Sequence, residues 1–368
     1  MIKSNFFVVL TLCCSMLCAS GVTGDLLAYG PTIRDRCWML GHDPGQHDSP
    51  GNVFKIPPSE PISQAEGCLS MGISNVCVVI WNHPNEDYCR QFKSLKRVSW
   101  AADNGWLKQV EGRDVYALQM PYIESRLETI PNLMGVDFDD FFYMEPRPES
   151  VVQTLDDGSR AVVAVGPMTQ KEAVAAKRRI ASWGRPRDMR IVVYSRDLVV
   201  PGIKPIVDVF NTVLFWTWDG CDLARLPENF ARYRRLFPDK PTILGIYMWD
   251  FGGRKPIGEK VMADQLAFAL EKLHAGELQG VMFHNTALAN KDIAEVKMVR
   301  RWIAEHGEET VGDRPTKKSD DLFEPFSTVL FQGDSIKPNG DRPPLRNQIG
   351  HTGGCRSLLK YDKDRGWF

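Results

Sequence analysis

The feature that most constrains the fold is an alternation of apolar runs of strand length with segments of helical periodicity. The runs expected to form strands lie at residues 36–42, 75–82, 114–120, 135–142, 189–195, 212–218, 242–250 and 278–285. The segments expected to form helices lie at residues 61–72, 87–103, 122–133, 169–184, 226–237, 258–276 and 291–307. The segment GIKPIVDVFN connects the fifth run to the sixth.

Near-continuous apolar strands that alternate with helices indicate a parallel sheet covered on both faces. Eight such units are the number that closes a (β/α)8 barrel, which we expect over residues 25–307. A doubly wound open sheet is the alternative. It is less favoured because neither GxGxxG nor GxxxxGK[ST] follows any of the runs, which weakens the nucleotide-binding forms of that fold.

The two ends of the chain differ from this pattern. Lys3, the apolar run 6–18 and the small residues at 19–24 predict a signal peptide over residues 1–24, and therefore an exported protein. Cys13 and Cys18 raise the alternative of a lipoprotein, but bulky leucines precede both. Residues 308–368 are rich in Pro, Gly, Lys and Asp, and form an extension that either packs on the barrel or is partly disordered.

The net charge and the cysteine content limit which partners and cofactors we expect for this chain. The formal net charge is −1 and the basic residues are scattered, so nothing points to a nucleic acid or to an anionic membrane. The apolar run near the N-terminus is short for a membrane span. Six cysteines follow the predicted signal peptide, and their pairing stays open. They include no CxxC pair, and we expect no structural zinc site and no cofactor. The oligomeric state stays open.

The stretch GVDFDDFF, at residues 135–142, places three aspartates in four positions of an apolar run. Because strand side chains alternate, Asp137 and Asp139 are expected to face the barrel interior and Asp140 to start the loop. Crowded carboxyl groups separate one another's pKa values, so that one can act as an acid while another stays ionised. The alternative is structural: Asp140 caps a helix and Asp137 binds a buried arginine.

Polar and aromatic residues also end the other expected strands, where the active sites of such barrels lie. The substrate-binding candidates are His42, Asp43, Trp81, Asn82, Asp137, Trp218, Asp219, Tyr247, Trp249 and His284. Further residues at these ends are Tyr194, Arg196, Trp216 and Asn285. Aromatic walls suit the C–H faces of a sugar, and carboxylates, amides and histidines suit its hydroxyls. Glycoside hydrolysis requires two carboxyl groups across the scissile bond.

This arrangement resembles the glycoside-hydrolase (β/α)8 barrels that carry acids at the ends of strands 4 and 7. The resemblance covers residues of about 30–307 and rests on Asp139, Asp140 and Asp250, which stand where that group usually has glutamates. GVDFD (135–139) is also similar to the D-x-D of chitinase-type barrels, although the glutamate acid of those enzymes would fall at Phe141. The resemblance implies that Asp139 or Asp140 and Asp250 are the catalytic pair, with Asp219 as a substitute partner.

The sequence therefore predicts an exported glycoside hydrolase acting on a carbohydrate. Two alternatives stay open. One is a non-catalytic carbohydrate-binding barrel. The other is a metal-dependent hydrolase built on GHDPGQHD (41–48), in which His42, Asp43 or His47 would meet the strand 4 aspartates around an ion. The H-x-H that such hydrolases usually carry on strand 1 is absent, so no metal ligand is assigned.

Overall fold

The computed structural model describes most of the expected barrel. The described residues are 29–42, 47–58, 60–80, 84–102, 115–143, 153–154, 160–161, 169–185, 187–200, 202–312, 361–362 and 366–367. The predicted signal peptide and most of the predicted extension lie outside these residues. Within them, no helix combines the length and the apolar character needed to cross a membrane.

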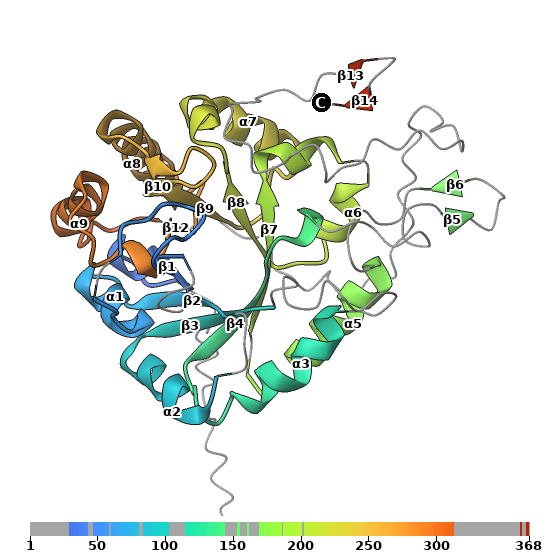
Figure 1. Cartoon of the computed structure of the whole chain (residues 1–368). Coiled ribbons are helices and arrows are strands. Elements are labelled where there is room, and N and C mark those ends of the chain that lie inside the picture. The colour runs from blue at the N-terminus through green and yellow to red at the C-terminus, as the bar shows by residue number, and fades with distance from the viewer. Residues whose placement is uncertain are drawn as a thin grey trace, which may run out of the picture.

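Eight parallel strands close into a barrel, which confirms the predicted fold (Figure 1). They are β1 (Cys37–His42), β2 (Asn75–Val79), β3 (Arg97–Ala101), β4 (Leu133–Phe138), β7 (Asp188–Tyr194), β8 (Thr212–Trp216), β9 (Thr242–Tyr247) and β12 (Gly280–His284). Each strand pairs with the next in chain order, and β12 closes the ring against β1. Short antiparallel pairs form outside it, namely β5 (Gln153–Thr154) with β6 (Arg160–Ala161), β10 (Trp249–Asp250) with β11 (Lys255–Pro256), and β13 (Tyr361–Asp362) with β14 (Gly366–Trp367).

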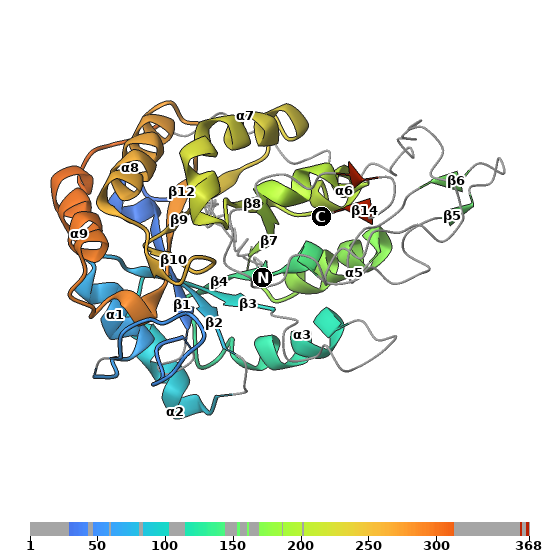
Figure 2. The ribbon, with the colours of Figure 1, turned by 45° about the horizontal axis from the view of Figure 1, so that its top comes forward.

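Helices surround the strands, as Figures 1 and 2 show from two directions. They are α1 (Gln64–Ser70), α2 (Glu86–Cys89), α3 (Val115–Ser125), α5 (Gln170–Ala181), α6 (Ile203–Val207), α7 (Leu226–Leu236), α8 (Glu259–His274) and α9 (Ala294–His306). The threonine cap expected at the start of α5 is present: Thr169 accepts from the Glu172 amide, and Glu172 bonds back to the Thr169 amide. Ser63 and Glu66 form the same capping box on α1.

The third strand was placed wrongly by the sequence analysis. It is β3, inside the segment expected to be a helix at 87–103, whereas the expected strand at 114–120 lies largely within α3. A five-residue strand directly after a helical turn gives too short a window for its period to be read. Val115 and Tyr116 favour a strand at 114–120, but their strand propensity is outweighed by the tertiary setting. The segment forms α3, although that helix also contains Pro121.

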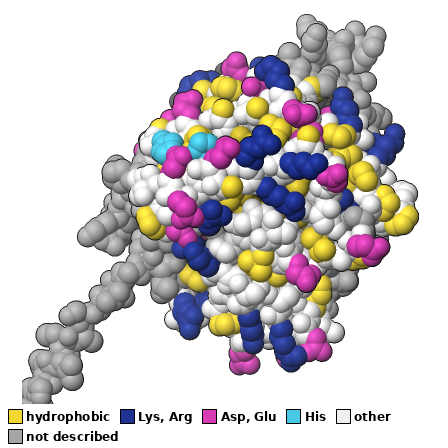
Figure 3. Space-filling model, turned by 90° about the vertical axis from the view of Figure 1, so that its left-hand side faces the viewer, with side chains coloured by type: hydrophobic (Ala, Val, Ile, Leu, Met, Phe, Trp, Pro, Cys, Tyr) yellow, Lys and Arg dark blue, Asp and Glu magenta, His cyan; other side chains and the backbone are white. Residues whose placement is uncertain are grey.

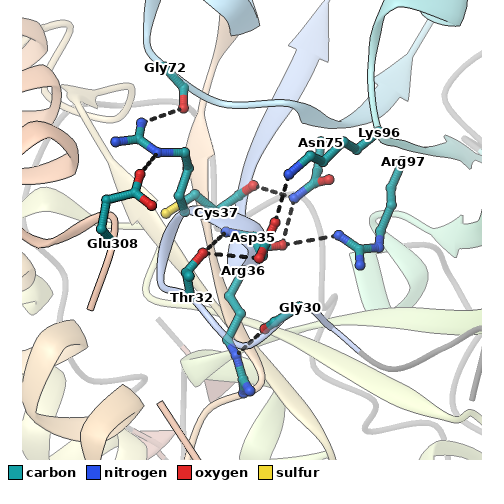
Figure 4. A network of polar contacts seen from close by, with 11 residues as sticks. Gly30, Thr32, Asp35, Arg36, Cys37, Gly72, Asn75, Lys96, Arg97 and Glu308 are labelled. Atoms are coloured by element: carbon teal, nitrogen blue, oxygen red, sulfur yellow. Dashed lines mark hydrogen bonds and ion pairs between the residues drawn. The ribbon is translucent and has the colours of Figure 1, made fainter. Parts of the chain in front are cut away.

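A polar network fastens the N-terminal ends of β1, β2 and β3 (Figure 4). Asp35 accepts from Lys96 at 2.9 Å and from Thr32 at 3.0 Å, and its backbone carbonyl accepts from Asn75 and Arg97. Burial raises the pKa of Asp35, but the hydrogen bonds from Lys96 and Thr32 lower it by a larger amount. The net pKa is therefore below the ordinary value. This end of a (β/α)8 barrel serves stability rather than chemistry.

The outer faces of α8 and α9 carry acidic and basic side chains that are interspersed (Figure 3). Lys260 and Asp264 form an ion pair one helical turn apart, at 2.7 Å. The opposite faces of these helices bury residues such as Leu266 and Val299 against the strands. Each helix is thus amphipathic, as the sequence pattern indicated.

A charged cluster fills part of the barrel interior. Arg190 of β7 and Asp137 of β4 form a salt bridge with both side chains 1% exposed, and Ser99 of β3 hydrogen-bonds to both. The Arg190 guanidinium also lies over the Trp38 ring, 4.4 Å from its centroid. Burial lowers the pKa of Arg190, but the charge of Asp137, together with Tyr29, the hydrogen bond to Asp137 and the charge of Asp188, raises it by more, so Arg190 stays a cation. Three strands are therefore tied together at one level of the barrel.

Asp137→Ala should lower the free energy of unfolding by about 3–5 kcal/mol, because it leaves the buried Arg190 cation without its counter-ion. Asp264→Ala, which breaks an exposed pair on α8, should cost at most about 1 kcal/mol. Urea unfolding of the two variants and the wild type measures both values. Equal losses in the two variants would show that the interior pair does not stabilise the barrel.

Candidate functional site

Most of the predicted site residues lie at the C-terminal ends of the barrel strands or just after them. Those that the structure describes there are His42, Asp139, Asp140, Trp218, Asp219, Tyr247, Trp249, Asp250 and His284. Asp43, Trp81 and Asn82 lie outside the described residues. Asp137 is the exception among the described candidates. Its contacts with Arg190 and Ser99 in the barrel interior match the alternative of a buried arginine partner.

Asp140 holds an unusual backbone conformation directly after β4. Its φ is 47°, in the left-handed region, where aspartate and asparagine are tolerated better than most residues. Its amide donates to Asp139 Oδ1 at 2.9 Å, and its own Oδ1 accepts from the Tyr194 hydroxyl at 2.8 Å. Among the described residues, Lys55 and Arg254 share this conformation. The turn thus orients the Asp140 carboxylate toward β7.

Arg196 interacts with carboxylates that follow two strands. It follows β7, and its guanidinium lies 4.6 Å from the Tyr194 ring centroid and 5.5 Å from that of Trp218. Burial lowers its pKa, but the charge of Asp197, with Tyr194 and the charges of Asp140 and Asp219, raises it above the ordinary value. Arg196 is therefore a buried cation that interacts with Asp197, Asp140 and Asp219.

Tyr247 ends β9 and interacts with the same charged groups. It is 3% exposed, and burial raises its pKa; Arg196 lowers it, and the charges of Asp140, Asp139 and Asp219 raise it again, so that the net pKa is well above the ordinary value. Its ring lies 5.0 Å from that of Trp216 and 5.2 Å from that of His284. Gly245 leaves the space that the Trp216 ring occupies, because a Cβ at position 245 would fall 1.9 Å from that ring. A small residue on β9 thus admits a large ring from β8 into the barrel.

Asp219 and Asp250 form a second acidic group, after β8 and β9. Burial raises the pKa of Asp219, Arg196 lowers it, and the like charges of Asp222 and Asp250 raise it again, for a net increase. The Asp250 carboxylate accepts from the Gly253 amide at 2.7 Å and packs against Gly220 and Gly253. Asp219 thus holds its proton more tightly than an ordinary aspartate, and the Asp250 carboxylate stabilises the loop that contains Gly253.

Three histidines meet on the other side of Tyr247. His42 ends β1, His284 ends β12, and His47 lies in the loop after β1. One ring nitrogen of each lies within 4.8 Å of those of the other two. Burial, and then His284, lowers the pKa of His47 to about 3, and burial with His42 lowers that of His284 well below its ordinary value. Among the described residues, the histidines of GHDPGQHD therefore group with His284 of β12 and not with the strand 4 aspartates.

Aromatic side chains enclose the histidines. Phe251 lies 4.4 Å from His284, and Phe54 lies 4.9 Å from His47, between ring centroids. Trp249 is 3% exposed and donates from Nε1 to the Phe54 carbonyl at 3.0 Å, so it holds the loop rather than lining an open surface. The sequence analysis missed Phe54 and Phe251, because no local pattern indicates which loops meet. Arg190 could have been found from its place inside the apolar run MRIVVYS.

Comparison with known proteins gives a likeness of fold. No family model matches the chain, and no curated protein matches it. Among solved structures, active domain 2 of a chitinase from Pyrococcus furiosus is 12% identical with a TM-score of 0.45, and the alignment covers 76% of this chain and 99% of that one. A xylanase-A-amylase inhibitor protein is 11% identical, with a TM-score of 0.43 and coverage of 76% and 99%.

A third similar structure is the GH99 endo-alpha-mannosidase from Bacteriodes thetaiotaomicron, at 9% identity and a TM-score of 0.40, with coverage of 75% of this chain and 98% of that one. Two of these three proteins are glycoside hydrolases and one is an inhibitor protein. At this level of similarity the likeness concerns the barrel alone.

Proposed function

We propose that this chain is a glycoside hydrolase that cleaves a carbohydrate with two carboxyl groups, Asp140 and Asp219, at the C-terminal end of the barrel. The observation that carries the proposal is the unlike setting of these two groups around one cation. Asp219 has a raised pKa, Asp140 is oriented by Tyr194, and both interact with Arg196 and Tyr247. Two carboxyl groups with separate environments are what acid and base roles require.

In this proposal Asp219 is the general acid, which protonates the glycosidic oxygen as the bond to the leaving group breaks. Asp140 is the carboxylate that either attacks the anomeric carbon or removes a proton from the attacking water. Trp218, half-buried beside Arg196, is a stacking surface for a sugar ring. Asp139, whose Oδ1 accepts a hydrogen bond from the Asp140 amide, is a positioning residue. Asp250 holds the loop and raises the pKa of Asp219.

The setting of the enzyme is also part of the proposal. The signal peptide predicted over residues 1–24 would export it, which suits an enzyme that acts on an extracellular or cell-envelope polysaccharide. The competing interpretation is a barrel that binds carbohydrate without cleaving it. It requires the aromatic surface but not the pair of carboxyl groups, so mutation of the carboxyl groups separates the two.

Asp140→Asn and Asp219→Asn should each reduce kcat by roughly 100- to 10,000-fold, because each removes one acid–base partner. The measurement is release of reducing ends from a panel of polysaccharides and aryl glycosides. Asparagine tolerates the left-handed conformation at position 140, so that variant keeps its backbone. Asp250→Asn should lose less activity than either, and Asp264→Asn, on the exposed face of α8, should retain the wild-type rate.

Two results of this experiment would count against the proposal. Full activity in Asp140→Asn or Asp219→Asn would remove the pair from the chemistry. Saturable sugar binding by the wild type, with no product from any member of the panel, would favour the binding barrel. Thermal melting of each variant shows whether a lost rate reflects lost folding instead.

The alkaline limb of the pH profile of kcat/KM should follow Asp219, because the enzyme loses activity as this acid ionises. The groups that act on it are Arg196, Asp222 and Asp250. Asp222→Asn removes a like charge, so the pKa of Asp219 falls and the limb moves to lower pH. Arg196→Met removes the opposite charge, so the pKa rises and the limb moves to higher pH. Shifts in the same direction, or no shift in either variant, would contradict the role given to Asp219.

A further inference from the structure

We propose that His42, His47 and His284 bind one transition-metal ion, with Zn²⁺ the best match, beside the carboxyl groups of the barrel mouth. This site goes beyond the proposed glycosidase chemistry and does not depend on it. From the sequence alone, a metal-dependent hydrolase built on GHDPGQHD stays an alternative with no metal ligand assigned, because the H-x-H of metal-dependent barrels is absent from strand 1. The structure supplies a ligand from a second strand instead. His284 ends β12, and β12 pairs with β1 to close the barrel.

The geometry suits a single ion. The three candidate ligand nitrogens lie within 4.8 Å of one another. Two zinc–nitrogen bonds of about 2.0–2.1 Å at a tetrahedral angle place their nitrogens about 3.4 Å apart, so the rings have to close by up to about 1.4 Å to bring all three into contact with one ion. The rings of His42 and His47 are already 4.0 Å apart between centroids, and that of His284 is 5.4 Å from His42.

The surroundings contain the outer partners that metal-binding histidines require. Asn285 lies 2.7 Å from His47 Nδ1 through its side-chain amide, and its other amide atom, Oδ1, is buried with no hydrogen-bond partner among the described residues. The two ends of an amide are interchangeable by rotation. With Oδ1 turned to His47, Nδ1 donates to it and Nε2 presents its lone pair to an ion. His284 Nδ1 is likewise buried with no partner in the described part of the chain.

The backbone that carries the ligands is held from several sides. Thr286 Oγ1 accepts from the His42 amide at 3.0 Å and donates to the His42 carbonyl at 3.2 Å. Lys291 and Asp48 form an ion pair at 2.9 Å with side chains 3% and 9% exposed, which fixes the residue next to His47. A ligand set that is fixed before the ion arrives costs less to order on binding.

The ligand type selects the ion. Three imidazoles suit Zn²⁺, Cu²⁺, Ni²⁺ or Fe²⁺, whereas Mg²⁺ and Ca²⁺ prefer oxygen ligands. Three protein ligands are also the set that leaves a fourth position of a tetrahedral zinc ion for water or substrate. Tyr247, whose ring lies 5.2 Å from that of His284, interacts with Asp140 and Asp219 on its other side. An ion here would therefore lie close to the carboxyl groups.

The test is a titration of the tag-free full chain with Zn²⁺ and with Co²⁺, followed by calorimetry and by the visible absorption of bound Co²⁺. We expect one ion per chain. His47→Ala and His284→Ala should each weaken binding by more than the roughly 10- to 100-fold that Asn285→Ala should cost as an outer partner. The matched controls are His274→Ala and His306→Ala, which change part-exposed histidines beside Glu309 on α8 and α9 and should leave the affinity unchanged.

Three outcomes would overturn the inference: no saturable binding by the wild type, unchanged affinity in both His47→Ala and His284→Ala, or loss of binding in the surface controls. Thermal melting without metal establishes that each variant is folded, and His47→Gln replaces any variant that is not. Because binding is measured without substrate, its failure would leave the proposed hydrolase intact. Conversely, a chain that binds metal and cleaves no glycoside would refute the hydrolase alone.

Discussion

The rest of the structure depends on the buried contact between Arg190 and Asp137. An ionised pair inside a barrel is costly to desolvate, and it is sustained here because Ser99 and the face of Trp38 supply further interactions to the same two groups. The pair joins β4 to β7 beneath the site. Asp139 and Asp140 directly follow β4, so the salt bridge of Asp137 anchors the strand from which these carboxylates emerge.

Above this level, the site divides into two halves around Tyr247. On one side, Asp140 and Asp219, which follow β4 and β8, interact with Arg196, and burial raises the pKa of Asp219. On the other side, three histidines from β1, β12 and the loop after β1 gather behind a wall of phenylalanines. Burial holds His47 and His284 neutral, so the two halves differ in charge as well as in ligand type.

The site residues that were predicted correctly from the sequence are those that end barrel strands. His42, Tyr247 and His284 end barrel strands as expected, because long apolar runs fix where a strand stops. The expectation at 114–120 failed because a short strand and a helix with β-branched residues cannot be separated by periodicity alone. Asp137 was offered both as a site residue and as the partner of a buried arginine. Only the position of Arg190, 53 residues further along the chain, distinguishes these roles.

The sequence by itself determined that the chain forms a (β/α)8 barrel and that His42, Tyr247 and His284 stand at strand ends, because hydrophobic period and strand length are local properties. The tertiary structure alone decided which of those residues meet. It set His47 beside His284, directed Asp140 to Tyr194, and brought Asp219 within the influence of Arg196. These contacts arise from barrel closure, which brings β12 against β1 and aligns the ends of strands that are distant in sequence. Proton affinity and metal coordination depend on such distances, and no local pattern encodes them.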